Sequence, residues 1–140
     1  MILLDTSGVI AWIDARQRQH AEIVAAMAET EPPFVLSPFV LAELDYLVAT
    51  RVGSHAQLAL LDEVARGAFA LEPFSTADVA AANEVIRKYP QLEIGLADAS
   101  IVILAERRHC LDVLTLDERH FRTLRAMRGE AFRLIPADRT

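Results

Sequence analysis

Short apolar runs alternate with longer, partly polar stretches along the whole of this chain. The apolar runs are rich in Ile, Leu, Val and Phe, as buried strands are, and the stretches between them have helical spacing. The predicted strands are Met1–Leu4, Phe34–Leu36, a segment within Phe69–Phe74, Asp112–Leu116 and Phe132–Ile135. Strands that alternate with helices are typical of a three-layer α/β/α fold with a short, mostly parallel central sheet.

Capping residues and prolines set the expected limits of the helices. Thr6 or Ser7 can cap a helix after the first strand. Ser37 followed by Pro38 is typical of an N-cap with proline at the first helical position. The predicted helices run from the first cap to about Ala15, and over His20–Thr30, Phe39–Arg51, Ser54–Arg66, Thr76–Tyr89, Leu96–His109 and, as a basic helix or turn, Glu118–Arg128. No repeat or linker interrupts this pattern, so we expect one domain over residues 1–140.

The stretch Ile94–Leu104 is apolar at nearly every position, which predicts a buried helix. It nevertheless carries a carboxylate, Asp98, on the same helical face as Ile101 and Val102. An ionised group in such a place is costly unless a cation or a set of donors meets it. No lysine or arginine in the pattern is an evident partner for Asp98.

Composition narrows the class of protein. Of the residues 53% are hydrophobic, Cys110 is the one cysteine, and no apolar run reaches the length of a membrane span. We therefore expect a cytoplasmic protein with no internal disulfide, no membrane association and no secretory signal. The net charge is −6, but acids outnumber bases 15 to 6 over residues 1–106, whereas 8 arginines outnumber 5 acids over residues 107–140. Arginine suits phosphate recognition, although a solvated helix face explains this bias as well.

Four acids stand out by their positions. Asp5 and Asp117 follow the first and fourth predicted strands, so they should lie at the same edge of the sheet, where open parallel sheets bind ligands. Glu43 and Asp98 lie on apolar helix faces. Taken singly, each acid could cap a helix, reach solvent or pair with an arginine. Four converging carboxylates would repel one another unless a divalent cation joins them, and oxygen ligands favour Mg²⁺ or Mn²⁺. Such a cluster suits phosphodiester cleavage.

The motifs that contain these acids resemble those of PIN-domain nucleases, and among them the VapC-like ribonuclease toxins of toxin–antitoxin pairs. The resemblance covers almost the whole chain and keeps the family's order. The matching segments are Leu4-Asp5-Thr6-Ser7, Ser37-Pro-Phe-Val-Leu-Ala-Glu43-Leu, Gly95-Leu-Ala-Asp98-Ala-Ser100-Ile and Leu114-Thr-Leu-Asp117-Glu-Arg-His-Phe121.

The resemblance implies a site and a set of partners. Asp5, Glu43, Asp98 and Asp117 correspond to the family's catalytic, metal-binding acids. Thr6 and Thr115 match polar positions that support them. The implied activity is that of a Mg²⁺- or Mn²⁺-dependent endoribonuclease acting on structured cellular RNA. The implied partners are a VapB-like antitoxin, whose C-terminal segment covers the acidic site, and a second copy of the chain in a homodimer.

Arginines and a histidine follow the last acid. Arg119, Arg122 and Arg125 recur at helical spacing and are the candidates for guiding an RNA backbone, with a solvated face as the alternative. His120 could contact phosphate, although a structural role is the simpler interpretation. Some relatives have a further Asp or Asn where residues 118–120 stand, so the number of bound metals stays open.

Two other functions remain as alternatives. A non-catalytic binding module of the same fold would be expected to lack one or more of the acids. An aspartate-based phosphatase would use Asp5 as the phosphoryl acceptor, but it also needs an aspartate two residues on, where Ser7 stands, and a nearby lysine. Lys88 is the only lysine in the chain.

Overall fold

The computed structural model describes residues 1–140 and has a five-stranded sheet at its centre. The strands are β1 (Ile2–Leu4), β2 (Phe34–Leu36), β3 (Ala70–Leu71), β4 (Asp112–Leu114) and β5 (Arg133–Ile135). Their order across the sheet is β3-β2-β1-β4-β5, and all four pairings are parallel. The α/β prediction is therefore confirmed, and the sheet is wholly parallel.

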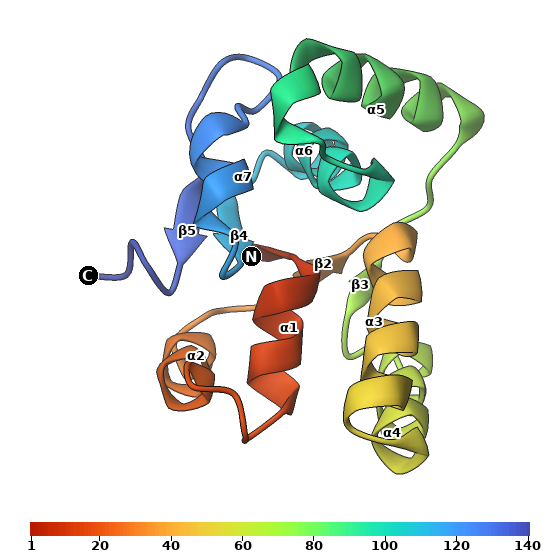
Figure 1. Ribbon diagram of the computed structural model, residues 1–140, viewed down its shortest axis with the longest axis vertical. Coiled ribbons are helices and arrows are strands. Elements are labelled where there is room, and N and C mark those ends of the chain that lie inside the picture. Colours follow the sequence, from red (N-terminus) through yellow and green to blue (C-terminus); the bar gives the residue numbers. More distant parts are fainter.

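Seven α-helices and one short 3-10 helix connect the strands. They are α1 (Thr6–Ile13), α2 (His20–Ala28), α3 (Pro38–Arg51), α4 (Ser54–Ala65), α5 (Thr76–Lys88), η1 (Pro90–Leu92), α6 (Leu96–Arg108) and α7 (Glu118–Thr123). Successive strands move to one side of β1 and then return to its other side, so right-handed crossovers place α1–α4 on one face and α5–α7 on the other. Figure 1 shows these two groups below and above the sheet, which completes the three layers. No helix in the chain is both long enough and apolar enough to cross a membrane.

Predicted and observed limits differ mainly where side chains replace backbone pairing. The fourth strand ends at Leu114 instead of Leu116, because the Thr115 side chain accepts a hydrogen bond from the backbone of Asp117. The basic segment after Asp117 forms only the short helix α7, and Arg125 lies beyond it in a bridge with Ala131. The helical spacing expected for Arg119, Arg122 and Arg125 was therefore wrong for Arg125.

The core forms one cluster of 34 buried apolar residues around the sheet. β1 lies in the middle of the sheet and is buried along its whole length. The start of α1 packs closely on β4: a Cβ atom added to Gly8 would lie 2.5 Å from the carbonyl oxygen of Leu114. Only glycine permits this approach, which brings the residues after β1 against those after β4.

Candidate metal and catalytic site

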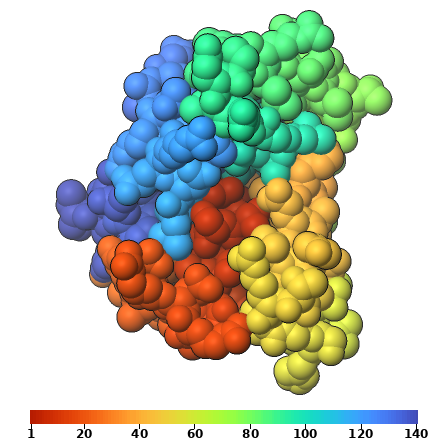
Figure 2. Space-filling model, viewed as in Figure 1, coloured from red at the N-terminus to blue at the C-terminus, as the bar shows by residue number.

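A polar cavity of about 310 Å³ lies at the carboxyl ends of β1 and β4. This is the point at which strand order reverses, where open α/β sheets bind ligands. Figure 2 shows the hollow, with red N-terminal residues at its base and later segments of the chain around it. All four predicted acids line it, and the full lining is Asp5, Thr6, Ser7, Ile10, Gln17, Glu43, Leu47, Arg51, Asp98, Leu116 and Asp117.

Asp5 forms the base of this acidic cavity and is only 6% exposed. Its Oδ2 accepts hydrogen bonds from the hydroxyls of Thr115 at 2.6 Å and Ser7 at 2.9 Å. Burial raises the pKa of Asp5, although the two hydroxyls oppose that shift. Ser7 also accepts a hydrogen bond from the backbone of Leu116 at 3.0 Å, so it ties α1 to the segment after β4. Thr115 thus lies where a supporting residue was predicted, and Ser7 is a supporting residue that the sequence pattern did not reveal.

Glu43 reaches the cavity from α3, but not from a buried face as expected. The buried face of α3 consists of Val40, Leu44 and Val48, and Glu43 itself is exposed. Its Oε1 accepts a hydrogen bond of 2.6 Å from the hydroxyl of Thr6, which holds the carboxylate at the cavity edge. The prediction that Glu43 is buried, which was based on its apolar neighbours, was therefore wrong. Its position beside the site agrees with the prediction.

Asp98 lies in the first turn of α6, with its side chain 19% exposed. Burial and the negative charge of Asp5 raise its pKa to about 6, and Asp117 and Glu43 contribute in the same direction. The residue that meets Asp98 is His120, whose Nδ1 lies 3.4 Å from Asp98 Oδ2. As the sequence indicated, no lysine or arginine meets Asp98; the neighbouring His120 comes from a separate helix that sequence spacing could not place.

Asp117 is the N-cap of α7, and His120 contacts both of its oxygens. Oδ1 accepts a hydrogen bond from the His120 backbone at 3.0 Å, and Oδ2 lies 2.8 Å from His120 Nδ1. The other ring nitrogen of His120, Nε2, lies 3.0 Å from the carbonyl oxygen of Leu92 in η1. Asp117 therefore combines the capping role considered for it with a place at the cavity.

The donors in the cavity suit a divalent cation, although they do not form a ready-made cage. No three His, Cys, Asp or Glu side chains lie close enough together to hold an ion between them. Mg²⁺ usually takes only one or two carboxylates directly and keeps several waters, so it does not need such a cage. Burial and then the negative charge of Asp5 raise the pKa of Asp98, and a bound cation would relieve that repulsion. Asp5, Asp98, Glu43 and Asp117 are the residues that would hold it.

Known proteins share this sequence and arrangement. A profile of the PIN domain matches residues 2–126. The chain belongs to the PIN domain family. Ribonuclease VapC26 of Mycobacterium tuberculosis is 44% identical over 135 residues, which cover 96% of this chain and all of that protein.

Solved structures confirm the PIN fold. VapC20 of Mycobacterium tuberculosis, described as a sarcin–ricin loop cleaving toxin, superposes with a TM-score of 0.78 at 21% identity, over 84% of this chain and 90% of that one. FitAcB from Neisseria gonorrhoeae has a TM-score of 0.66 at 25% identity, over 95% and 97%. FitAB bound to an IR36 DNA fragment has a TM-score of 0.63 at 24% identity, over 96% and 94%.

Arg51 is the one lysine or arginine that lines the acidic cavity of this PIN domain. It ends α3, and its side chain forms no ion pair or hydrogen bond within the chain. Arg16 fixes the backbone there by donating to the Arg51 carbonyl at 2.7 Å while its guanidinium contacts Asp14 at 2.9 and 3.0 Å. These hydrogen bonds lower the pKa of Asp14 to about 2. Arg51 was not predicted, because nothing in sequence marks the end of α3 as adjacent to Asp5.

The three arginines predicted from spacing do not line the cavity. Arg122 is held by Asp138 at 2.7 Å and Glu118 at 2.9 Å. Arg125 donates to the carbonyl oxygen of Arg122 at 3.1 Å. Arg119 is exposed and its side chain is unpaired.

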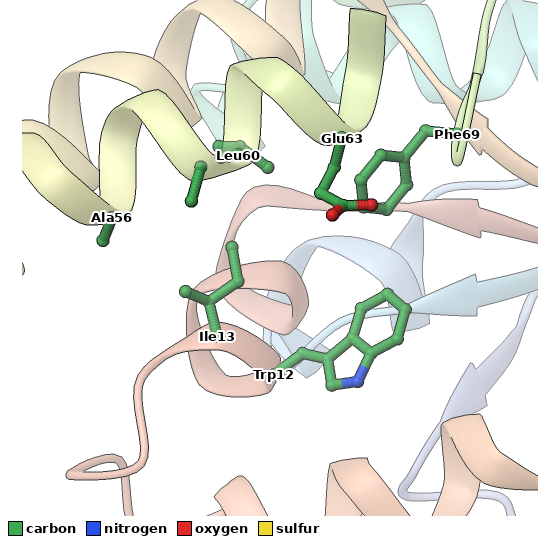
Figure 3. A pocket seen from close by; sticks show the side chains of 7 residues that line it. Trp12, Ile13, Ala56, Leu60, Glu63 and Phe69 are labelled. Atoms are coloured by element: carbon green, nitrogen blue, oxygen red, sulfur yellow. The ribbon is translucent and has the colours of Figure 1, made fainter. Parts of the chain in front are cut away.

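A second cavity of this PIN domain, of about 350 Å³, is almost entirely apolar and shares no lining residue with the acidic one. It lies between α1 and α4, and Figure 3 shows Trp12 and Ile13 of α1 across from Leu60 and Glu63 of α4. Trp12 packs edge-to-face on Phe69, with ring centroids 6.3 Å apart. Glu63 is the only charged residue in its lining. The cavity therefore offers a surface for apolar contact and no catalytic groups.

Proposed function

We propose that this PIN domain is a metal-dependent endoribonuclease and the toxin of a VapBC-like toxin–antitoxin pair. The observation that carries the proposal is the convergence of Asp5, Glu43, Asp98 and Asp117 on one cavity. The 44% identity to a ribonuclease named VapC26 supports the RNA substrate, and such nucleases are metal-dependent in general. The similarity of the fold to that of VapC20, a toxin, agrees with the toxin role.

The residues of the cavity have separate tasks in this proposal. A bound Mg²⁺ or Mn²⁺ supplies Lewis-acid stabilisation of the phosphodiester and favours attack by water. Asp5 and Asp98 bind the cation, and Thr115 and Ser7 keep the Asp5 carboxylate in one orientation. Thr6 does the same for Glu43. The buried base of the cavity excludes bulk water from beneath the reacting phosphate.

Incubating total RNA with the purified protein, in Mg²⁺ or Mn²⁺ against EDTA, tests this function. We expect metal-dependent cuts that are lost in Asp5→Asn. Cleavage that persists in this variant after stringent purification would contradict the site assignment. A protein that binds RNA or a partner protein but never cuts would be the non-catalytic module. The phosphatase alternative has little support, because Lys88 lies over the Tyr89 ring and does not line the cavity.

An RNA backbone would approach the acids past positive or neutral side chains. Arg51 and Gln17 lie on the cavity wall and can contact the phosphate that reaches the cation. Arg119, with its unpaired and exposed side chain, remains a candidate for a more distant phosphate. Arg122 and Arg125 are also retained as candidate contacts, but Arg122 would first have to leave its acidic partners.

The antitoxin is proposed to lie along α1. This helix carries Thr6 at the acidic cavity and Trp12 and Ile13 at the apolar one. Its 8 residues span about 12 Å. A short antitoxin segment could therefore fill the apolar cavity and cover the acids together. The nuclease is further proposed to act in the cytoplasm, as a homodimer in which residues 1–140 form a single domain.

A further inference from the structure

His120 is the one residue whose side chain contacts the carboxylates of two of the four acids, and three separate interactions fix it. Its ring lies between α7, the first turn of α6, and η1. Nε2 lies 3.0 Å from the carbonyl oxygen of Leu92. A carbonyl oxygen only accepts, so Nε2 must carry a hydrogen and the ring orientation is set.

With Nε2 directed at Leu92, Nδ1 is left facing the carboxylates. It lies 2.8 Å from Asp117 Oδ2 and 3.4 Å from Asp98 Oδ2. Nδ1 is buried, and neither contact is aligned as a hydrogen bond should be. The ring therefore lies against both carboxylates, and it is placed where it separates them.

The consequence for Asp117 differs from that for Asp98. Both oxygens of Asp117 are engaged by His120, one by its backbone amide and the other by its ring. Asp98 accepts no hydrogen bond, and only its Oδ2 approaches the ring. Asp98 therefore has an oxygen that neither a hydrogen bond nor the ring engages, whereas both oxygens of Asp117 are in contact with His120.

We propose that His120 is a positioning residue that fixes Asp117 beside Asp98. Asp117 then supports the site through its contacts with His120, and Asp98 and Asp5 bind the cation directly. This inference rests on the proposed function, because it concerns the same cation. It assigns different roles to acids that the sequence motif treats alike. Side chains that orient metal ligands typically contribute 10–100-fold to metal affinity.

Titration of the metal-free protein with Mn²⁺, followed by electron paramagnetic resonance, tests the proposal without RNA. We expect His120→Ala and Asp117→Asn each to weaken binding by about 10–100-fold, and the double variant to be no weaker than either one. Asp98→Asn should bind no detectable Mn²⁺. Effects of His120→Ala and Asp117→Asn that multiply in the double variant would overturn the proposal. Nitrogen hyperfine coupling from His120 would overturn it too, by making the ring a direct ligand.

Two conservative variants separate positioning from a merely structural role. The amide nitrogen of His120→Asn takes the place of Nδ1 and remains beside Asp117, whereas that of His120→Gln takes the place of Nε2 and reaches towards Leu92. We expect Asn, but not Gln, to restore most of the Mn²⁺ affinity lost in His120→Ala. Equal behaviour of Asn and Gln would refute positioning, with thermal unfolding in EDTA as the check on folding. A wild type that binds Mn²⁺ but cuts no RNA would refute only the proposed function, and one that binds no Mn²⁺ would overturn both.

Discussion

Asp98→Asn should make the metal-free protein more stable while it removes nuclease activity. The pKa of Asp98 is raised from 3.8 to about 6, chiefly by burial and then by the charge of Asp5. An acid whose pKa is higher in the folded state than in the unfolded state destabilises the fold once it is ionised. The penalty is absent below pH 4, grows between pH 4 and 6, and is complete above about pH 6.

The size of the effect follows from the shift. Two pKa units correspond to about 3 kcal/mol, and burying the new amide takes back about 1 kcal/mol of that gain. We therefore expect Asp98→Asn to raise the free energy of unfolding by about 2 kcal/mol at pH 8 in EDTA. For a chain of 140 residues this raises the thermal midpoint by roughly 7 °C.

Thermal unfolding followed by circular dichroism, in EDTA at pH 8 and pH 4, measures this difference. The gain should vanish at pH 4, where Asp98 is protonated in the folded state and only about half ionised in the unfolded state. Saturating Mg²⁺ should stabilise the wild type but not the variant, since ligands stabilise only the state that binds them. Asp62→Asn, on an exposed position of α4, is the matched control and should change little. A variant no more stable than the wild type at pH 8, or a gain that persists at pH 4, would refute the argument that repulsion and burial burden Asp98.

Three further predictions concern other parts of the structure. Gly8→Ala should lower the free energy of unfolding by about 1–3 kcal/mol in urea, because its Cβ meets the backbone of β4; an unchanged midpoint would contradict that packing. Arg51→Gln should raise the KM for RNA about tenfold and leave Mn²⁺ affinity nearly unchanged, since loss of one charged contact costs about 1.5 kcal/mol or more; Arg122→Gln, which does not touch the cavity, should have a smaller effect. Ala59→Asp, in the apolar cavity, should weaken antitoxin binding at least about tenfold without changing RNA cleavage. Ala65→Asp, on the same helix but outside that cavity, should leave antitoxin binding unchanged. Equal effects of the two variants on antitoxin binding would exclude the cavity as the docking site.

Much of the fold could be predicted because the strands are short, apolar and separated by clear capping signals. The capping role of Ser37 and the proline after it are present as expected. Asp5 and Asp117 could be placed at one edge because the carboxyl ends of parallel strands share it. The strand limits near Thr115 could not be predicted, because a side-chain hydrogen bond there replaces the backbone pairing.

The four acids of the site could be predicted from the sequence, but the residues that contact them could not. Asp98 was conspicuous because a carboxylate interrupts an apolar helix, yet its partner His120 is distant in sequence and belongs to a short helix that sequence does not orient. Glu43 was expected on a buried face, but the register of α3 turns it towards Thr6 instead. Arg51 was not identified, since only the tertiary arrangement brings the end of α3 to the cavity.

The central position of β1 has a consequence for synthesis of this protein on the ribosome. Asp5 directly follows β1, and β1 pairs on one side with β4, whose residues are made about a hundred positions later, as in the pairing of Leu3 with Val113. Until β4 has left the ribosome, Thr115 and Asp117 cannot pack beside Asp5. A chain that is stopped before Asp112 should therefore leave RNA intact. The order of the strands thus withholds nuclease activity from a growing chain, and a cell translating this protein would be exposed only to copies that have completed the sheet around β1.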